Sequence, residues 1–270
     1  MALPPIAPMK LPTGKYLVFV GHDMINNSLA TTGAWEPWTV DIAHALVTQL
    51  DPRPGTIIDV GANLGAITIA LAHRLSPGYA LHCFEMQRIV YYQLCGNIVI
   101  NGLENVFAHH MGLGAVDEVI SVPRPDYAPD PNVGAVSASQ AVRDLRQSVP
   151  TDQGNTAMEP ARFCRLDSLG LQDVRLIKVD VEGMELDVLK GGAKTLARNN
   201  YPPLILEIWK SGSPGERTAQ AEALLAHIED LGYASHVTGS TCIAQHRSRP
   251  ALKVEWDGQA RTFRTAPQTP

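Results

Sequence analysis

Cysteine is scarce in this chain, and so are basic clusters and long apolar runs. The four cysteines, Cys83, Cys95, Cys164 and Cys242, are widely spaced and form no Cys-x-x-Cys pair. Their spacing matches neither a zinc site nor a disulfide framework. It indicates buried or free thiols in a reducing compartment.

An excess of positive charge is also missing. The formal net charge is -5 and no run of Lys or Arg exceeds two residues, so electrostatics favour neither nucleic acid nor an anionic membrane as a partner. No window approaches the ~18 apolar residues of a membrane span. The opening MALPPIAPMK has prolines where a signal peptide needs an apolar helix. We expect a soluble, cytoplasmic protein that binds neither nucleic acid nor a membrane, and a homo-oligomer stays open.

Apolar residues make up 45% of the 270-residue chain and charged residues 18%, which predicts a globular core. From residue 51 onward, segments typical of strands and helices alternate. Strands are expected at 56–60, 80–85, 174–181 and 203–209, and helices at 65–75, 87–101 and 216–231. Such alternation predicts an α/β fold with a doubly wound, mostly parallel sheet and helices on both faces.

Composition divides the chain into three parts. Residues 1–50 form an N-terminal segment that ends in an entry helix, and 51–246 form the alternating domain. Residues 247–270 form a polar tail whose end we expect to be poorly ordered. The alternation is interrupted at 123–162, which holds six prolines. Loops of this length are usually lids, binding loops or disordered insertions, and we interpret this one as a candidate lid.

The stretch IIDVGANLG, residues 57–65, predicts a strand, a glycine-bearing turn and a helix start. A dinucleotide site needs Gly-x-Gly-x-x-Gly, but Asn63 stands at the second glycine and would obstruct a diphosphate, which Asp59 would also repel. S-adenosylmethionine has an ammonium, a sulfonium and a carboxylate instead. Asp59 can attract its positive groups directly or through water, while Gly61 and Gly65 allow close backbone approach. The helix start, together with Asn63, can meet the carboxylate.

Two further acids fit the same cofactor. Glu85 ends the next expected strand, where a carboxylate can accept hydrogen bonds from both ribose hydroxyls. Glu36, in GAWEPW (33–38), can reach the ammonium from the entry side. The neighbouring tryptophans Trp35 and Trp38 are interpreted as packing or pocket-lining residues.

Acids also end the later strands. Asp180 and Glu182 follow one strand at alternate positions, and Glu207 ends another, so the carboxyl edge of the sheet gathers all three. They predict a general base or a Mg²⁺ site, with Asp180 and Glu207 as candidate ligands. The alternatives are that Glu182 caps the next helix and that Asp180 accepts backbone N–H bonds. Lys178, in an apolar run, is expected to pair with one of these acids.

Histidines offer a second source of a base. His109 and His110 lie near the end of a short expected strand, and histidine titrates near neutrality. A lone histidine is more often structural, so the strand-end acids are preferred. His22, beside Asp23, is held only as a substrate-side contact.

Three motifs resemble the FkbM-type methyltransferases, a family of class I S-adenosylmethionine-dependent enzymes. They are IIDVGANLG, LIKVDVEGMELDVLKGG (176–192) and LILEIW (204–209). Their order and spacing match from about residue 30 to 245, and the middle motif is the most specific. The resemblance implies a Rossmann-like methyltransferase fold and methyl transfer, usually to a hydroxyl of a sugar or small molecule. It does not identify the acceptor.

Two other functions remain open from the sequence. One is an NAD(P)-dependent oxidoreductase, against which Asp59 and Asn63 argue. The other is a non-catalytic module that kept its cofactor site, against which the retained strand-end acids argue. Methyl transfer to a hydroxylated sugar or secondary metabolite is the preferred prediction.

Overall fold

The computed structural model describes residues 3–20, 24–124, 137–139, 157–209 and 218–267. Its centre is a seven-stranded sheet in the order β11-β12-β10-β9-β3-β4-β5. The parallel strands are β3 (Thr56–Val60), β4 (Ala80–Glu85), β5 (Val106–His110), β9 (Val174–Val179) and β10 (Leu204–Glu207). An antiparallel pair, β11 (Tyr233–Thr238) and β12 (Thr241–His246), completes one edge. The prediction of a doubly wound, mostly parallel sheet is confirmed.

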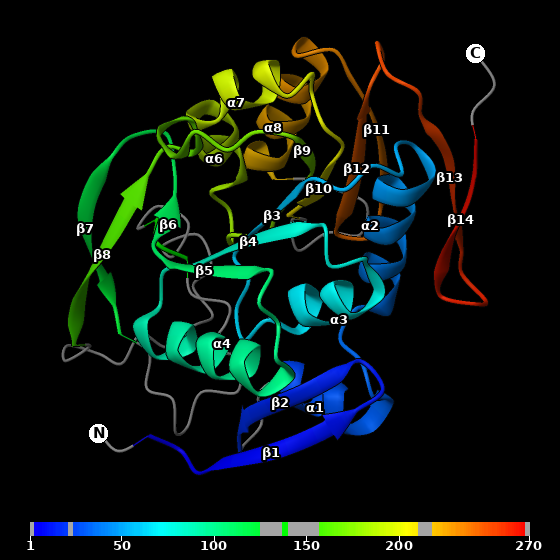
Figure 1. The fold of residues 1–270 in the computed structure, drawn as a ribbon. Helices are drawn as coiled ribbons and strands as arrows, with labels where there is room; N and C mark the ends of the chain where they lie inside the picture. The colour runs from blue at the N-terminus through cyan, green and yellow to red at the C-terminus, as the bar shows by residue number, and fades with distance from the viewer. Residues whose placement is uncertain (1–2, 21–23, 125–136, 140–156, 210–217, 268–270) are drawn as a thin grey trace.

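Helices cover both faces of this sheet (Figure 1). One face carries α2 (Pro37–Gln49), α3 (Ala66–Arg74) and α4 (Arg88–Asn101), and the other carries α6 (Glu185–Gly191), α7 (Ala193–Arg198) and α8 (Ala219–Asp230). Helix α8 buries Ala221, Leu224 and Ile228, one apolar face at helical spacing. Thr218 caps its start by accepting a hydrogen bond from the Ala221 backbone N–H at 3.2 Å.

Burial on both faces explains the composition of the central strand. Ile57, Ile58 and Val60 of β3 are each at most 2% exposed, as a strand covered by two helical layers requires. Strand β3 lies between β4 and β9, so the chain winds outward from it in both directions. This switch point is where doubly wound sheets open a crevice for ligands.

The N-terminal segment is more structured than the sequence indicated. The sequence predicted an entry helix at its end, but β1 (Ile6–Leu11) and β2 (Gly14–Phe19) also form an antiparallel hairpin, which is followed by α1 (Met24–Thr32). Asn97 and Asn101 of α4 accept hydrogen bonds from the backbone N–H groups of Leu17 (2.6 Å) and Lys15 (2.8 Å). The hairpin is thereby fixed to the main domain.

A small three-stranded sheet contains the two ends of the proline-rich insertion. It is built from β6 (Gly112–Leu113), β7 (Glu118–Pro123) and β8 (Met158–Cys164), in the order β6-β8-β7. The short 3-10 helix η2 (Leu166–Leu169) follows. Residues 125–136 and 140–156 lie outside the described residues, so the lid within 123–162 stays a prediction.

The polar tail contains a hairpin that the sequence reading did not anticipate. Strands β13 (Leu252–Asp257) and β14 (Thr262–Pro267) pair antiparallel. Leu252, Val254 and Phe263 are buried in the core that includes α2. The inward residues of β13 alternate with Lys253 and Glu255, which are exposed, so a period of two underlies the polar composition. Among the described helices, none has the length and apolar character needed to cross a membrane.

Candidate cofactor and acceptor site

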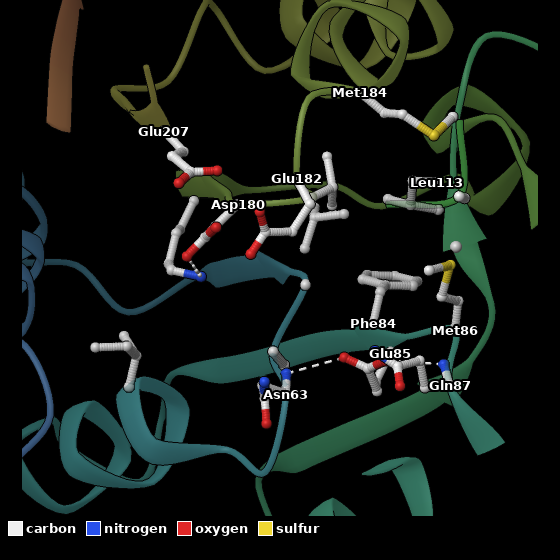
Figure 2. A pocket seen from close by; sticks show the side chains of 18 of the residues that line it. Asn63, Phe84, Glu85, Met86, Gln87, Leu113, Asp180, Glu182, Met184 and Glu207 are labelled. Carbon is white, nitrogen blue, oxygen red and sulfur yellow. Dashed lines mark hydrogen bonds and ion pairs between the residues drawn. The ribbon is translucent and has the colours of Figure 1, made fainter. Parts of the chain in front are cut away.

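A cavity of about 360 Å³ opens at the carboxyl ends of β3, β4, β9 and β10 (Figure 2). Its walls come from the turn after β3, the ends of β4 and β9, and the start of the small sheet. The predicted residues that line it are Glu36, Gly61, Asn63, Glu85, Asp180, Glu182 and Glu207. Asp59 and Gly65 are not among the lining residues.

The turn after β3 depends on residues that accept positive φ. Gly61 has φ +77°, and a Cβ there would lie 1.8 Å from the backbone oxygen of Asp180. Asn63, at φ 51°, accepts a hydrogen bond from the Leu64 N–H through its own Oδ1 at 2.6 Å. Gly65 directly precedes α3, and a Cβ there would lie 2.7 Å from Leu94 Cδ1. Gly61 therefore allows the ends of β3 and β9 to approach closely, and Gly65 allows the start of α3 to pack against Leu94.

Glu85 is held with its carboxylate at the cavity wall. Its Oε2 accepts a hydrogen bond from the Asn63 N–H at 3.0 Å, and its Oε1 accepts one from the Gln87 N–H at 2.8 Å. Burial raises the pKa of Glu85 to about 7, although these two hydrogen bonds work in the opposite direction. Each oxygen retains acceptor capacity for a further hydrogen bond from a ligand.

Asp59 faces the sheet interior and not the cavity. Its carboxylate accepts a hydrogen bond from the Thr68 hydroxyl at 2.5 Å and pairs with Lys178 Nζ at 2.9 Å. It is 5% exposed. The carboxylate thus already has two protein partners, and an interaction of Asp59 with the positive groups of a cofactor stays a prediction.

Lys178 pairs with acids, as its apolar surroundings predicted. Its Nζ is 2.9 Å from Asp59 Oδ1 and 3.6 Å from Asp180 Oδ2. Burial acts to lower the pKa of Lys178, but the charges of Asp59 and Asp180 outweigh it and raise that pKa above its ordinary value. The lysine is thus a buried ammonium between two carboxylates.

Asp180, Glu182 and Glu207 meet at one side of the cavity, with carboxylate oxygens within 4.8 Å of one another. Burial, followed by the charges of Asp180 and Glu182, raises the pKa of Glu207 to about 9. Glu207 also accepts a hydrogen bond from Trp209 Nε1 at 2.7 Å. The donor set consists of oxygens, which suits Mg²⁺, and the same carboxylates suit a proton acceptor.

Glu36 approaches this cluster from the start of α2. It has φ 40° at the N-cap, and its carboxylate accepts a hydrogen bond from the Thr39 hydroxyl at 2.9 Å. Burial raises the pKa of Glu36, and the negative charge of Asp180 raises it further. Trp35 lines the cavity, whereas Trp38 packs edge-on against Trp256 at 6.2 Å.

Glu185 supports the acid cluster and was missed from the sequence. Its buried Oε1 accepts hydrogen bonds from the Val181 N–H at 3.0 Å and the Gly183 N–H at 3.2 Å. It therefore holds the turn that carries Asp180 and Glu182, whose φ of 58° is left-handed. The second glutamate of the Glu-Gly-Met-Glu stretch was the available signal.

The opposite side of the cavity is apolar, and the sequence reading did not assign it. Its lining side chains are Phe84, Met86, Met111, Leu113, Phe163 and Met184. Figure 2 shows Met86, Leu113 and Met184 along one wall, across from the three acids. Met86 and Met111 each follow a strand end, the only signal the sequence offered. Gln87 adds an amide to this half.

The candidate histidines lie outside the cavity lining. His109 Nε2 is 3.0 Å from His82 Nδ1, and its ring stacks on Phe84 with centroids 4.5 Å apart. His110 stacks on Tyr91 at 4.8 Å. The contacts of His109 and His110 are structural. His22 lies outside the described residues.

A known protein family matches the part of the chain that forms most of this cavity. The family model described as the methyltransferase FkbM domain matches residues 59–235. The chain belongs to the FkbM methyltransferase family. The matched region contains every predicted cavity-lining residue except Glu36.

Two curated relatives are similar to this FkbM-family chain. "Methyltransferase 1" of Beauveria bassiana is 26% identical over 52% of this chain and 59% of its own length. "Methyltransferase sdnD" of Sordaria araneosa is 28% identical over 67% of this chain and 74% of its own. The alignment thus spans less than two thirds of the Beauveria protein.

Among solved structures, one similar to this chain is a methyltransferase. The methyltransferase FkbM of Methylobacillus flagellatus has a TM-score of 0.46 and 18% identity, over 71% of this chain and 43% of that one.

Proposed function

We propose that this FkbM-family protein is an S-adenosylmethionine-dependent methyltransferase that methylates a hydroxyl of a sugar or small-molecule metabolite. The observation that carries the proposal is Glu85. Its buried carboxylate is oriented at the switch-point cavity by two backbone N–H groups and faces the acid cluster across the same space.

The cofactor's parts have separate partners. Glu85 accepts hydrogen bonds from the ribose hydroxyls, and the methionine walls beside it suit a flat, polarisable base. The first turn of α3, where Ala66 and Ile67 line the cavity, leaves backbone N–H groups for the carboxylate. Glu36 lies on the side where an ammonium would enter. Asn63 in place of a glycine disfavours a diphosphate.

Methyl transfer is an in-line displacement. The acceptor oxygen forms a bond to the methyl carbon while the carbon–sulfur bond breaks, which leaves a neutral thioether. The acceptor's proton passes to a carboxylate, for which Asp180 is the candidate because its side chain is 37% exposed at the cavity edge. Glu182 and Glu207 hold the acceptor hydroxyl in this scheme.

A second version of the mechanism includes Mg²⁺ at the same site. Asp180 and Glu207, together with Glu182, would hold it through oxygen atoms, and it would lower the pKa of the acceptor hydroxyl. The grouping of the three carboxylates supports this version. Without a cation, burial and the charges of Asp180 and Glu182 raise the pKa of Glu207; a bound Mg²⁺ would offset these charges, so the metal version requires Glu207 to lose its proton on binding.

Two measurements test the proposal. Calorimetry should show binding of S-adenosylhomocysteine and no binding of NAD⁺; the reverse result would identify an oxidoreductase instead. Transfer of a labelled methyl group should then be measured over a panel of hydroxylated sugars and metabolites, with EDTA or with Mg²⁺. Loss of transfer in EDTA and recovery with Mg²⁺ would support the metal. Binding of the cofactor without transfer to any acceptor would favour a non-catalytic module.

A further inference from the structure

The cavity has an unequal balance of charge. Five carboxylates line it, those of Glu36, Glu85, Asp180, Glu182 and Glu207, while Lys178 supplies the only Lys or Arg among the described lining residues. Lys178 is 7% exposed. A single ammonium in this position acts on every charge nearby, because screening by water is weak at a buried site.

The sheet itself sets the position of this ammonium. Asp59 and Lys178 are direct partners in the parallel register of β3 and β9. Lys178 and Asp180 are two residues apart along the extended chain, so their side chains leave the same face. The result is a chain of contacts from buried Asp59 through Lys178 to Asp180 at the cavity edge, at 2.9 and 3.6 Å.

A buried ion pair is weak evidence of a contribution to stability. Apolar residues of similar size in place of a buried ion pair are often neutral or stabilising. The Thr68 hydroxyl also bonds Asp59, so the acid is fixed on two sides. The ion pair between Lys178 and Asp180 connects this network to the cavity.

We propose that Lys178 is a positioning residue for methyl transfer, anchored by Asp59, and that it fixes the Asp180 carboxylate beside the reacting methyl group. Asp59 then acts through Lys178 and does not touch the cofactor. This inference rests on the proposed methyltransferase function. It also makes Lys178 the group that offsets negative charge around the cofactor's sulfonium.

A double variant separates this role from cofactor contact. Asp59→Leu with Lys178→Met replaces the pair by apolar side chains and leaves no buried charge unpaired. Its affinity for S-adenosylhomocysteine should stay within about threefold of wild type, whereas turnover should fall about tenfold or more because Asp180 loses its partner. The matched control is Asp51→Leu with Arg175→Met, an ion pair at the other end of β9. That control should leave both values unchanged.

A second readout needs no acceptor and is insensitive to a purely structural role. S-adenosylmethionine carries the sulfonium charge and S-adenosylhomocysteine does not. The double variant removes one negative and one positive charge, but only the positive one, that of Lys178, lines the cavity. Its loss should therefore shift the ratio of their Kd values by about threefold or more in favour of the cation. Asp180→Asn should shift the ratio the other way. It serves as the second variant if the double variant fails to fold, because it keeps the size of a side chain that is 37% exposed.

The outcomes distinguish the proposed methyltransferase function from the positioning role of Lys178. If wild-type protein binds neither compound, the proposed function fails. If wild type binds but the double variant keeps its turnover and its Kd ratio, only the positioning role of Lys178 is overturned. A crystal structure of wild type with S-adenosylhomocysteine adds a check without variants. Asp59 should keep Lys178 and Thr68 as partners, and a direct hydrogen bond from the ligand to Asp59 would refute the proposal.

Discussion

The protonation state of Glu85 should control how tightly the protein binds its cofactor. Its pKa of about 7 lies above the ordinary value because burial disfavours the carboxylate. Under the proposed function, ribose hydroxyls donate hydrogen bonds to Glu85. A carboxylate accepts such bonds more strongly than a protonated carboxyl does, so the ligand should bind the ionised form more tightly. We expect the Kd for S-adenosylhomocysteine to be about tenfold weaker at pH 6 than at pH 8. Calorimetry at both values measures this change.

The matched variant for that experiment is Glu85→Gln. It keeps the size of the side chain but cannot ionise, so its affinity should be weaker at pH 8 and nearly constant with pH. A wild-type protein whose affinity does not change between pH 6 and pH 8 would show that Glu85 does not receive the ribose.

Glu185 makes a different contribution at the same scale. One of its oxygens accepts two backbone N–H groups from the turn that bears the acids. Glu185→Ala leaves those buried donors unsatisfied, which should lower the free energy of unfolding by about 1–3 kcal/mol. Urea denaturation measures it. The control is Asp187→Ala on the same helix. Because the side chain of Asp187 is only half-buried, its loss should cost less than about 0.5 kcal/mol. Equal losses for the two variants would contradict the role of Glu185.

Single residues also show the limit of prediction from sequence. Gly61, Asn63, Glu85, Asp180, Glu182 and Glu207 line one cavity, and their gathering was predictable because parallel strands end at a common edge. The direction of Asp59 was not. It depends on the register that sets it opposite Lys178, and register is a tertiary property that neither strand encodes by itself.

The element that joins strand β3 to helix α3 depends on close approach to β9. Gly61→Ala would add a Cβ 1.8 Å from the Asp180 oxygen at a φ of +77°. The backbone at the end of β9 would have to move, so we expect a loss of more than about 3 kcal/mol and weaker cofactor binding. Gly102→Ala is the control, because its φ is +65° but nothing lies within 4 Å of the added atom. It should cost about 1–2 kcal/mol. Thermal unfolding of both variants separates the clash from the left-handed backbone.

Elements were predicted well where one periodicity dominates. The helices at 65–75, 87–101 and 216–231 became Ala66–Arg74, Arg88–Asn101 and Ala219–Asp230. The C-terminal hairpin was missed because its inward residues are few and alternate with charges in a polar stretch. Its pairing becomes favourable only against the surface of α2, and that surface is supplied by the rest of the fold.

At the scale of the whole molecule, the hairpin β13–β14 connects the end of the chain to the core. Phe263 is 8% exposed and packs edge-on against Trp256 at 4.9 Å. It belongs to the same core as α2, the helix that starts beside Glu36 in the cavity. The hairpin therefore packs on α2, and α2 begins next to Glu36 in the cavity wall. Phe263 itself does not line the cavity.

This layering predicts that stability and binding can be separated. Phe263→Ala should lower the free energy of unfolding by about 2–4 kcal/mol, since it leaves a hole in a packed core. At a temperature where the variant is folded, its Kd for S-adenosylhomocysteine should change by less than about twofold, because no cavity contact is lost. Phe107→Ala is the matched control. That ring is 46% exposed on β5, and its removal should cost about 1 kcal/mol or less. The contradicting result would be a Phe263→Ala variant that binds more weakly in proportion to its loss of stability. In that case α2 would transmit the change from the hairpin to Glu36. The cavity and the C-terminal hairpin would then form one cooperative unit.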